Sequence, residues 1–256
     1  MPLRHALTAV LLLALPLCGA AAEPARLGGG PDYERCLALL RFDPGEALLY
    51  ADGWEAAGGG EGARHCAALS LLALGETERG AERLEDLARR SGGDPAARAA
   101  AFADAGNAWM LAGDADRAFA AATMALTLAP DDPALVLDRA AALGAMERYA
   151  EALEDLDRAV ALDPSRADAW VLRGAAKRQL GRAADAERDV AHALSLAPDN
   201  AEALLERAAL RRARGDVKGA RADWGRAARL AADPAAAELA RRNLELNPAP
   251  DPPRRR

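Results

Sequence analysis

The amino-acid sequence predicts an all-α solenoid of stacked antiparallel helix pairs, and three observations support this fold class. Small residues recur every 34 residues from Ala99 onward, a period typical of helical repeat arrays. The chain is 51% hydrophobic but only 4% aromatic, so its core must consist largely of Ala and Leu, which favour helices. Three units end in a proline, Pro130, Pro164 or Pro198, where a helix cannot continue.

The small residues fall into three columns when the chain is divided into units that start at Ala99, Pro133, Ala167 and Ala201. The eighth and twentieth positions lie on facing surfaces of a helix pair, where small side chains permit close approach. The twenty-seventh position lets the next pair stack on the second helix. Stacking must supply the core, because no pair can bury its apolar face alone. The columns hold Gly106, Ala118 and Ala125; Ala140, Ala152 and Ala159; Gly174, Ala186 and Ala193; and Ala208, Ala220 and Ala227.

This register resembles the tetratricopeptide repeat (TPR) family, and the unit from Pro133 to Pro164 follows the family pattern best. The resemblance implies a right-handed superhelical solenoid. The last unit departs from the pattern, since Ala232 stands where the closing proline belongs. Lys177 and Arg211 occupy the eleventh position of their units, where the family prefers a large apolar residue or tyrosine. We therefore expect a thinner apolar seam there.

The organisation of the chain follows from this repeat array and from the composition of its flanks. We expect six segments: a signal peptide at 1–22, a disordered leader at 23–31, degenerate TPR-like helix pairs at 32–94, four TPR units at 95–234, a capping helix at 235–246 and a disordered Pro- and Arg-rich tail at 247–256.

The first segment is predicted to direct export and to be removed before Glu23. It has a basic start at Arg4, an apolar run over 6–17 and the small residues 20–22 that precede signal cleavage. The run is short for a membrane span. An uncleaved anchor and a lipid on Cys18 are the alternatives, and Leu17 stands where a lipoprotein signal needs a small residue. We therefore expect an exported chain, periplasmic or secreted, without a membrane span after cleavage.

Cys36 and Cys66 remain after the signal, and export would place them in a compartment that permits disulfides. They fall on the expected first helices of two adjacent pairs, which touch in a solenoid. We predict a Cys36–Cys66 disulfide, with two buried free thiols as the alternative. A redox dithiol is disfavoured because the sequence has no C-x-x-C motif.

Three arginines and three aspartates recur together at the seventh and twenty-third positions of their units. The unit from Ala99 has Ala105 and Ala121 there, so both charges disappear together. This pattern predicts structural ion pairs between the helices of a pair, rather than catalytic groups. The predicted pairs are Arg139 with Asp155, Arg173 with Asp189, and Arg207 with Asp223.

Residues suited to catalysis or cofactor binding are sparse. His65 and His192 lie in different units and have no metal-binding spacing, so we predict neither a metal site nor another cofactor. No serine lies in a G-x-S-x-G motif. The net charge of −6 argues against general nucleic-acid binding. We therefore predict that the protein is not an enzyme.

The resemblance implies a concave groove lined by the second, fifth, ninth and twelfth positions of each first helix. Its first half is small and apolar, which suits a helical or extended peptide, and its charged second half is suited to selecting the partner. The alternative is that these are ordinary solvent positions. The predicted groove residues are Asn107, Met110, Leu137, Asp168, Val171, Arg178, Glu202, Leu205 and Arg212.

These inferences predict a monomeric, non-catalytic interaction scaffold of the cell envelope that binds a partner peptide or protein. An accessory subunit of an envelope enzyme or assembly complex and a lipid-tethered scaffold are the alternatives. A stand-alone enzyme is the least favoured hypothesis.

Overall fold

The computed structural model describes residues 28–92, 94–232 and 234–248, and the prediction of an all-α TPR-type solenoid is confirmed there. The predicted signal segment, part of the predicted leader and nearly all of the predicted tail lie outside these residues. The helices are α1 (Pro31–Leu40), α2 (Pro44–Ala56), α3 (Gly60–Ala73), α4 (Thr77–Arg90), α5 (Pro95–Ala112), α6 (Ala115–Leu128), α7 (Pro133–Ala145), α8 (Tyr149–Leu162), α9 (Ala167–Gln179), α10 (Ala183–Leu196), α11 (Ala201–Ala213), α12 (Val217–Leu230) and α13 (Pro234–Leu246).

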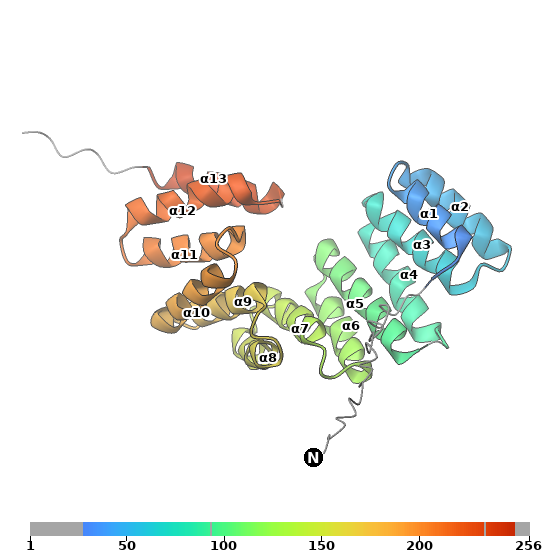
Figure 1. Cartoon of the computed structure of the whole chain (residues 1–256), viewed down its shortest axis with the longest axis horizontal. Helices are drawn as coiled ribbons and strands as arrows, with labels where there is room; N and C mark the ends of the chain where they lie inside the picture. The colour runs from blue at the N-terminus through green and yellow to red at the C-terminus, as the bar shows by residue number, and fades with distance from the viewer. Residues whose placement is uncertain (1–27, 93, 233, 249–256) are drawn as a thin grey trace, which may run out of the picture.

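Consecutive helices pair and stack along an arc, with α1–α4 at one end and α11–α13 at the other (Figure 1). The first helices α5, α7, α9 and α11 follow the inner, concave side, while α6, α8 and α10 lie toward the outer side. Helices α5, α7, α9 and α11 also contact one another in order. One continuous inner surface is therefore built from four repeat units.

Polar side chains and prolines fix where the helices begin. Asp43, Asp94 and Asp132 each accept a backbone N–H bond at a helix start, and each is followed by a proline at the first helical position. The turns inside three units have a left-handed glycine, Gly113, Gly181 or Gly215. The unit from Pro133 places Glu147 in that conformation instead, with φ of 59°.

The small-residue columns are buried between the helices, as close helix packing requires. Ala140, Ala152 and Ala159 are each at most 2% exposed. The central core cluster, which spans α4–α9, adds larger side chains such as Phe102 and Leu156. Each unit therefore shares its apolar surface with its neighbours, as expected of a repeat array.

Gly106 is predicted to accept alanine with a gain in stability. A Cβ there would lie 3.5 Å from the carbonyl oxygen of Ala118, an ordinary contact. Because alanine favours a helix interior by about 1 kcal/mol over glycine, Gly106→Ala should raise the free energy of unfolding by roughly 0.5–1 kcal/mol. Urea denaturation followed by circular dichroism measures the change.

Gly174 provides the matched comparison for this substitution. Its Cβ would lie 2.8 Å from Cγ2 of Val190, so the valine must move. Gly174→Ala should therefore raise the free energy of unfolding by less than Gly106→Ala does. A larger gain at Gly174 would contradict this packing.

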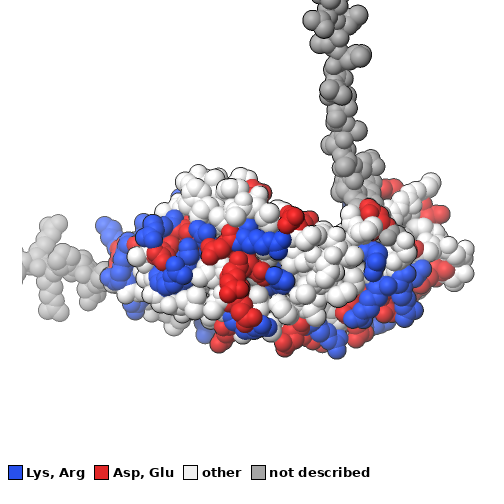
Figure 2. Space-filling model, turned by 90° about the horizontal axis from the view of Figure 1, so that it is seen from below, with Lys and Arg blue, Asp and Glu red and all other residues white. Residues whose placement is uncertain are grey.

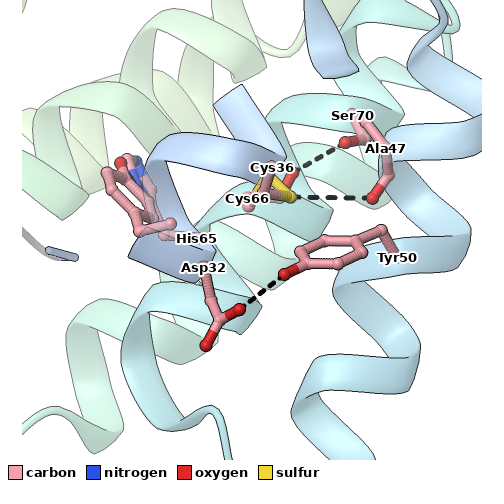
Figure 3. Close-up of a disulfide and its surroundings, with 8 residues drawn as sticks. Asp32, Cys36, Ala47, Tyr50, His65, Cys66 and Ser70 are labelled. Atoms are coloured by element: carbon pink, nitrogen blue, oxygen red, sulfur yellow. Dashed lines mark hydrogen bonds between the residues drawn. A yellow bond between two sulfur atoms is a disulfide. The ribbon is translucent and has the colours of Figure 1, made fainter. Parts of the chain in front are cut away.

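A disulfide joins α1 to α3 between Cys36 and Cys66, whose Cα atoms lie 6.3 Å apart (Figure 3). Both cysteines are fully buried. The Tyr50 hydroxyl donates a hydrogen bond to Asp32 at 2.7 Å, which ties α2 to α1. The N-terminal pair is thus held to the next pair by a covalent bond as well as by packing.

Candidate partner-binding groove

Each recurring arginine forms an ion pair with the aspartate of its own unit. The shortest N···O distances are 2.6 Å for Arg139–Asp155, 2.8 Å for Arg173–Asp189 and 2.7 Å for Arg207–Asp223. Each arginine uses two nitrogens against both carboxylate oxygens, the geometry that the guanidinium group favours. These charges hold two helices of a unit together.

Lys177 and Arg211 extend two of these pairs. Lys177 Nζ lies 2.7 Å from Asp189, and Arg211 lies 2.6 Å from Asp223. Burial alone raises the pKa of the Asp189 carboxyl, but hydrogen bonds from Arg173 and Lys177 outweigh it and hold that pKa below its ordinary value. The charged eleventh position therefore serves a buried network, which sequence reasoning missed.

The first four predicted groove residues along the chain differ in exposure. Asn107 is exposed on α5, and Met110 is half-buried there. Leu137, however, is only 6% exposed and belongs to the central core. Leu137 therefore offers little surface to a partner, because its side chain packs within that core. Asp168 is half-buried and pairs with Arg166 at 2.7 Å.

The other five predicted groove residues line two adjoining cavities of about 380 and 450 Å³ between α9, α11 and α13. The two cavities share Leu205, Glu206 and Leu239. Val171 reaches the smaller cavity but is 2% exposed, so it forms the floor rather than a projecting contact. The five residues are Val171, Arg178, Glu202, Leu205 and Arg212.

Helix α13 supplies one wall of both cavities through Leu239, which is 51% exposed. The sequence predicted a capping helix with a polar face, and Arg241 and Arg242 are indeed exposed. Helix α13 therefore does more than end the stack. No repeat register extends to it, so only the structure places its side chains.

Most charges in this half of the groove are paired within the chain. Arg178 binds Glu206, with a shortest distance of 2.8 Å, and Arg212 donates a hydrogen bond to Asn247. These arginines are therefore less available to a partner than the sequence suggested. Glu202, in the first turn of α11, is exposed.

Asp138 on α7 lies close to other carboxylates on the inner side of the arc. Burial, together with the negative charges of Asp132, Asp104 and Asp168, raises the pKa of Asp138 to about 6, although Arg166 opposes this shift. The sequence suggested no such cluster. It depends on how successive units are rotated, which the repeat period does not specify.

The pKa of Asp138 predicts a pH-dependent effect of Asp138→Asn. The carboxyl binds its proton more tightly in the folded chain than in the unfolded chain. Below about pH 4 the carboxyl is protonated and does not disfavour folding, whereas its ionisation lowers the free energy of unfolding as the pH rises through about 6. Asp138→Asn should therefore stabilise the protein by about 2 kcal/mol at pH 8 and hardly at all at pH 4. Urea denaturation at both pH values measures this difference. An equal change in the free energy of unfolding at the two pH values would contradict the raised pKa of Asp138. Asp116→Asn, at an exposed position, is the control and should show no such pH dependence.

The outer side carries mixed charge. Figure 2, viewed from below the arc, shows two regions rich in charged side chains, with a band of few charges between them. Helices α4 and α6 enclose a cavity of about 680 Å³ whose lining alternates arginines with carboxylates. Arg89 pairs with Glu85 and Arg83 with Asp52 there. Much of the charge beside this cavity is therefore compensated by ion pairs within the chain.

The described part of the chain has no group of three or more His, Cys, Asp or Glu side chains placed to hold a metal ion. Within the same residues, no helix combines the length and apolar character needed to cross a bilayer. The features that distinguish the inner side are one mainly apolar cavity, an adjoining cavity of mixed lining, exposed polar groups and an acidic cluster. Such a surface can recognise a ligand by shape and charge.

Comparisons with known proteins agree with the fold. Family models described as tetratricopeptide repeat match residues 107–177 and 167–200. No curated protein matches the chain.

Several solved structures share the fold. A tetratricopeptide repeat protein from Parabacteroides merdae has a TM-score of 0.67 at 16% identity, covering 84% of this chain and 82% of that one. The TPR protein TTC0263 of Thermus thermophilus has a TM-score of 0.59 at 21% identity, covering 71% and 97%. YrrB, described as a TPR protein with an unusual peptide-binding site, has a TM-score of 0.56 at 18% identity, covering 68% and 89%. Residues 107–200 are therefore tetratricopeptide repeats, and the stacked helix pairs on either side continue the same TPR-type solenoid.

Proposed function

We propose that this protein is a non-catalytic scaffold that binds a segment of a partner protein on the concave side of its solenoid. The observation that carries the proposal is the pair of adjoining cavities, because five side chains that the repeat register assigns to the groove line them. Curved solenoids present extended concave surfaces of this kind to partners. The peptide-binding site described for YrrB adds support.

The proposed recognition is non-covalent. The cavities combine apolar floor residues such as Leu205 with a few polar groups at the edge, the usual composition of a binding pocket. The recurring Arg–Asp pairs join the two helices of a unit, so they stiffen the groove rather than contact a ligand. A rigid groove reduces the ordering cost when a flexible segment binds.

We further propose that the protein acts outside the cytoplasm, in the cell envelope or as a secreted protein, as the signal-like character of residues 1–22 suggests. The Cys36–Cys66 disulfide supports this setting, because disulfides persist in oxidising compartments. The intact mass of the protein recovered from the exported fraction tests it. A chain that starts at Glu23 is expected. A lipidated Cys18 would favour a tethered scaffold, and a retained Met1 would contradict signal cleavage.

Crosslinked capture from intact cells tests the binding proposal through matched charge reversals. The groove variant is Asp168→Arg with Glu202→Arg, on the first helices α9 and α11. The control is Asp116→Arg with Glu154→Arg, at exposed positions on the second helices α6 and α8. The two variants change the net charge equally.

We expect a partner that the normal chain and the control variant both capture, and that the groove variant loses by at least tenfold. Equal capture by all three chains would contradict binding on the concave side. Loss from both variants alike would indicate a general charge effect and would also count against it.

A further inference from the structure

The face that α13 turns toward the cavities departs from that of a simple cap. Ala237 and Ala240 are buried, and Ala240 packs with Leu204 and Ala227 of the preceding pair. Leu239, the neighbour of Ala240, instead lines both cavities and is half-exposed. A helix that only ends a solenoid needs a polar outer face. Helix α13 therefore presents an apolar side chain to the groove as well as closing the stack.

The smaller cavity has an apolar lining drawn from three helices. Val171, Leu172 and Ala175 come from α9, Leu205 from α11 and Leu239 from α13. Its volume of about 380 Å³ lies at the low end of ligand pockets, which suits one or two aliphatic side chains. Apolar walls on three sides would remove such side chains from water, the main source of binding energy there.

The charge at the edge of this cavity is negative. Glu202 and Glu206 line it, and the lining includes no lysine or arginine among the described residues. Glu206 already pairs with Arg178 at 2.8 Å. Exposed Glu202 has no ion-pair partner within 28–92, 94–232 and 234–248. A cationic group beside the buried aliphatic side chain would therefore be attracted, and a carboxylate would be repelled.

We propose that the cavity between α9, α11 and α13 is a subsite for an aliphatic side chain of a partner segment that carries a lysine or arginine within about one helical turn. The aliphatic group packs against Leu205 and Leu239, and the cation faces Glu202. The adjoining 450 Å³ cavity, which shares Leu205 and Leu239, accommodates the neighbouring residues of the segment. This proposal rests on the proposed binding of a partner on the concave side, and it specifies which side chains of the partner are recognised.

A phage-displayed library of random 12-residue peptides, selected on the purified full chain, tests the subsite. We expect the selected peptides to share Leu, Ile or Val followed or preceded within four residues by Lys or Arg. Fluorescence anisotropy then compares the affinity of these peptides for variant chains. Leu239→Asp should weaken binding at least tenfold, and Glu202→Lys several-fold.

Leu49→Asp is the matched control, because Leu49 on α2 is also an exposed helical leucine, at 76%, and lies far from the groove in the chain. It should bind the peptides as the normal chain does. Circular dichroism checks that each variant is folded. Both leucines are exposed, so neither substitution removes a core side chain.

Several outcomes would overturn the subsite. One is a consensus without the aliphatic and basic pair. Another is unchanged binding by Leu239→Asp while Asn107→Arg or Asp168→Arg abolishes it, which would leave concave binding intact elsewhere. Peptide binding that no inner-side variant affects, or no selected peptide at all, would contradict the proposed function as well. Self-association that Leu239→Asp abolishes would place a second copy in the cavity and also overturn the proposal.

Discussion

Replacing Asp189 with alanine is expected to destabilise the solenoid by about 3–5 kcal/mol, the largest effect of any single substitution considered. Asp189 has a side chain only 5% exposed and neutralises both Arg173 and Lys177, which are 14% and 11% exposed. Removing the carboxylate leaves two nearly buried cations without their main partner, and breaking a buried ion pair in this way is strongly destabilising. Urea denaturation followed by circular dichroism measures the loss.

Asp157 is the matched control because it also pairs with Arg173, at 3.0 Å, but its side chain is 59% exposed. Asp157→Ala should cost about 0–1 kcal/mol, as exposed ion pairs usually do. Combining Asp189→Leu with Arg173→Leu and Lys177→Met should recover much of the stability, since no buried charge then remains. If Asp189→Ala costs no more than Asp157→Ala, the buried network does not hold α9 and α10 together.

Removing the Cys36–Cys66 disulfide should destabilise the N-terminal helix pair by about 3 kcal/mol. The bond closes a loop of 30 residues, and the chain-entropy model assigns roughly this stabilisation to a loop of that length. Helix α1 is short and packs mainly against α2 and α3, so the loss should remain local. Hydrogen exchange of Cys36→Ala/Cys66→Ala should therefore show faster exchange in α1 and α2.

A reductant provides the control for the disulfide. It should accelerate exchange in α1 and α2 of the normal chain and have no effect on the double variant. Exchange in α7–α10 should remain unchanged in both. Normal protection of α1 and α2 after full reduction would show that packing alone holds this pair.

The sequence alone predicts the features that follow from the 34-residue period, such as which side chains of a helix pair face each other. Residues 16 apart, such as Arg139 and Asp155, face each other because every unit repeats the same helix pair, so their pairing follows from register. Helix ends could be placed because Asp132 with Pro133 starts a helix. Lys177 lies one helical turn from Arg173, so its contact with Asp189 was also implicit in the register; the preference for an apolar residue at that position obscured it.

Other features depend on quantities that a repeat period does not contain. The exposure of Leu137 and Val171 depends on how tightly successive units wrap, and both are nearly buried. The acidic surroundings of Asp138 combine side chains from three units, so they follow from the superhelical rotation. Helix α13 lies beyond the last complete unit, and nothing in the register predicts that Leu239 lines the groove.

Photo-crosslinking from single positions is the most direct test of the central claim that partners bind the concave side. A benzophenone amino acid would be placed at Asn107 or Glu202 on the inner side, and at Asp116 or Glu154 on the outer side, all exposed in the structure. After irradiation of cells, we predict a partner adduct from Asn107 or Glu202 and none from Asp116 or Glu154. Adducts from the outer positions alone would contradict the account.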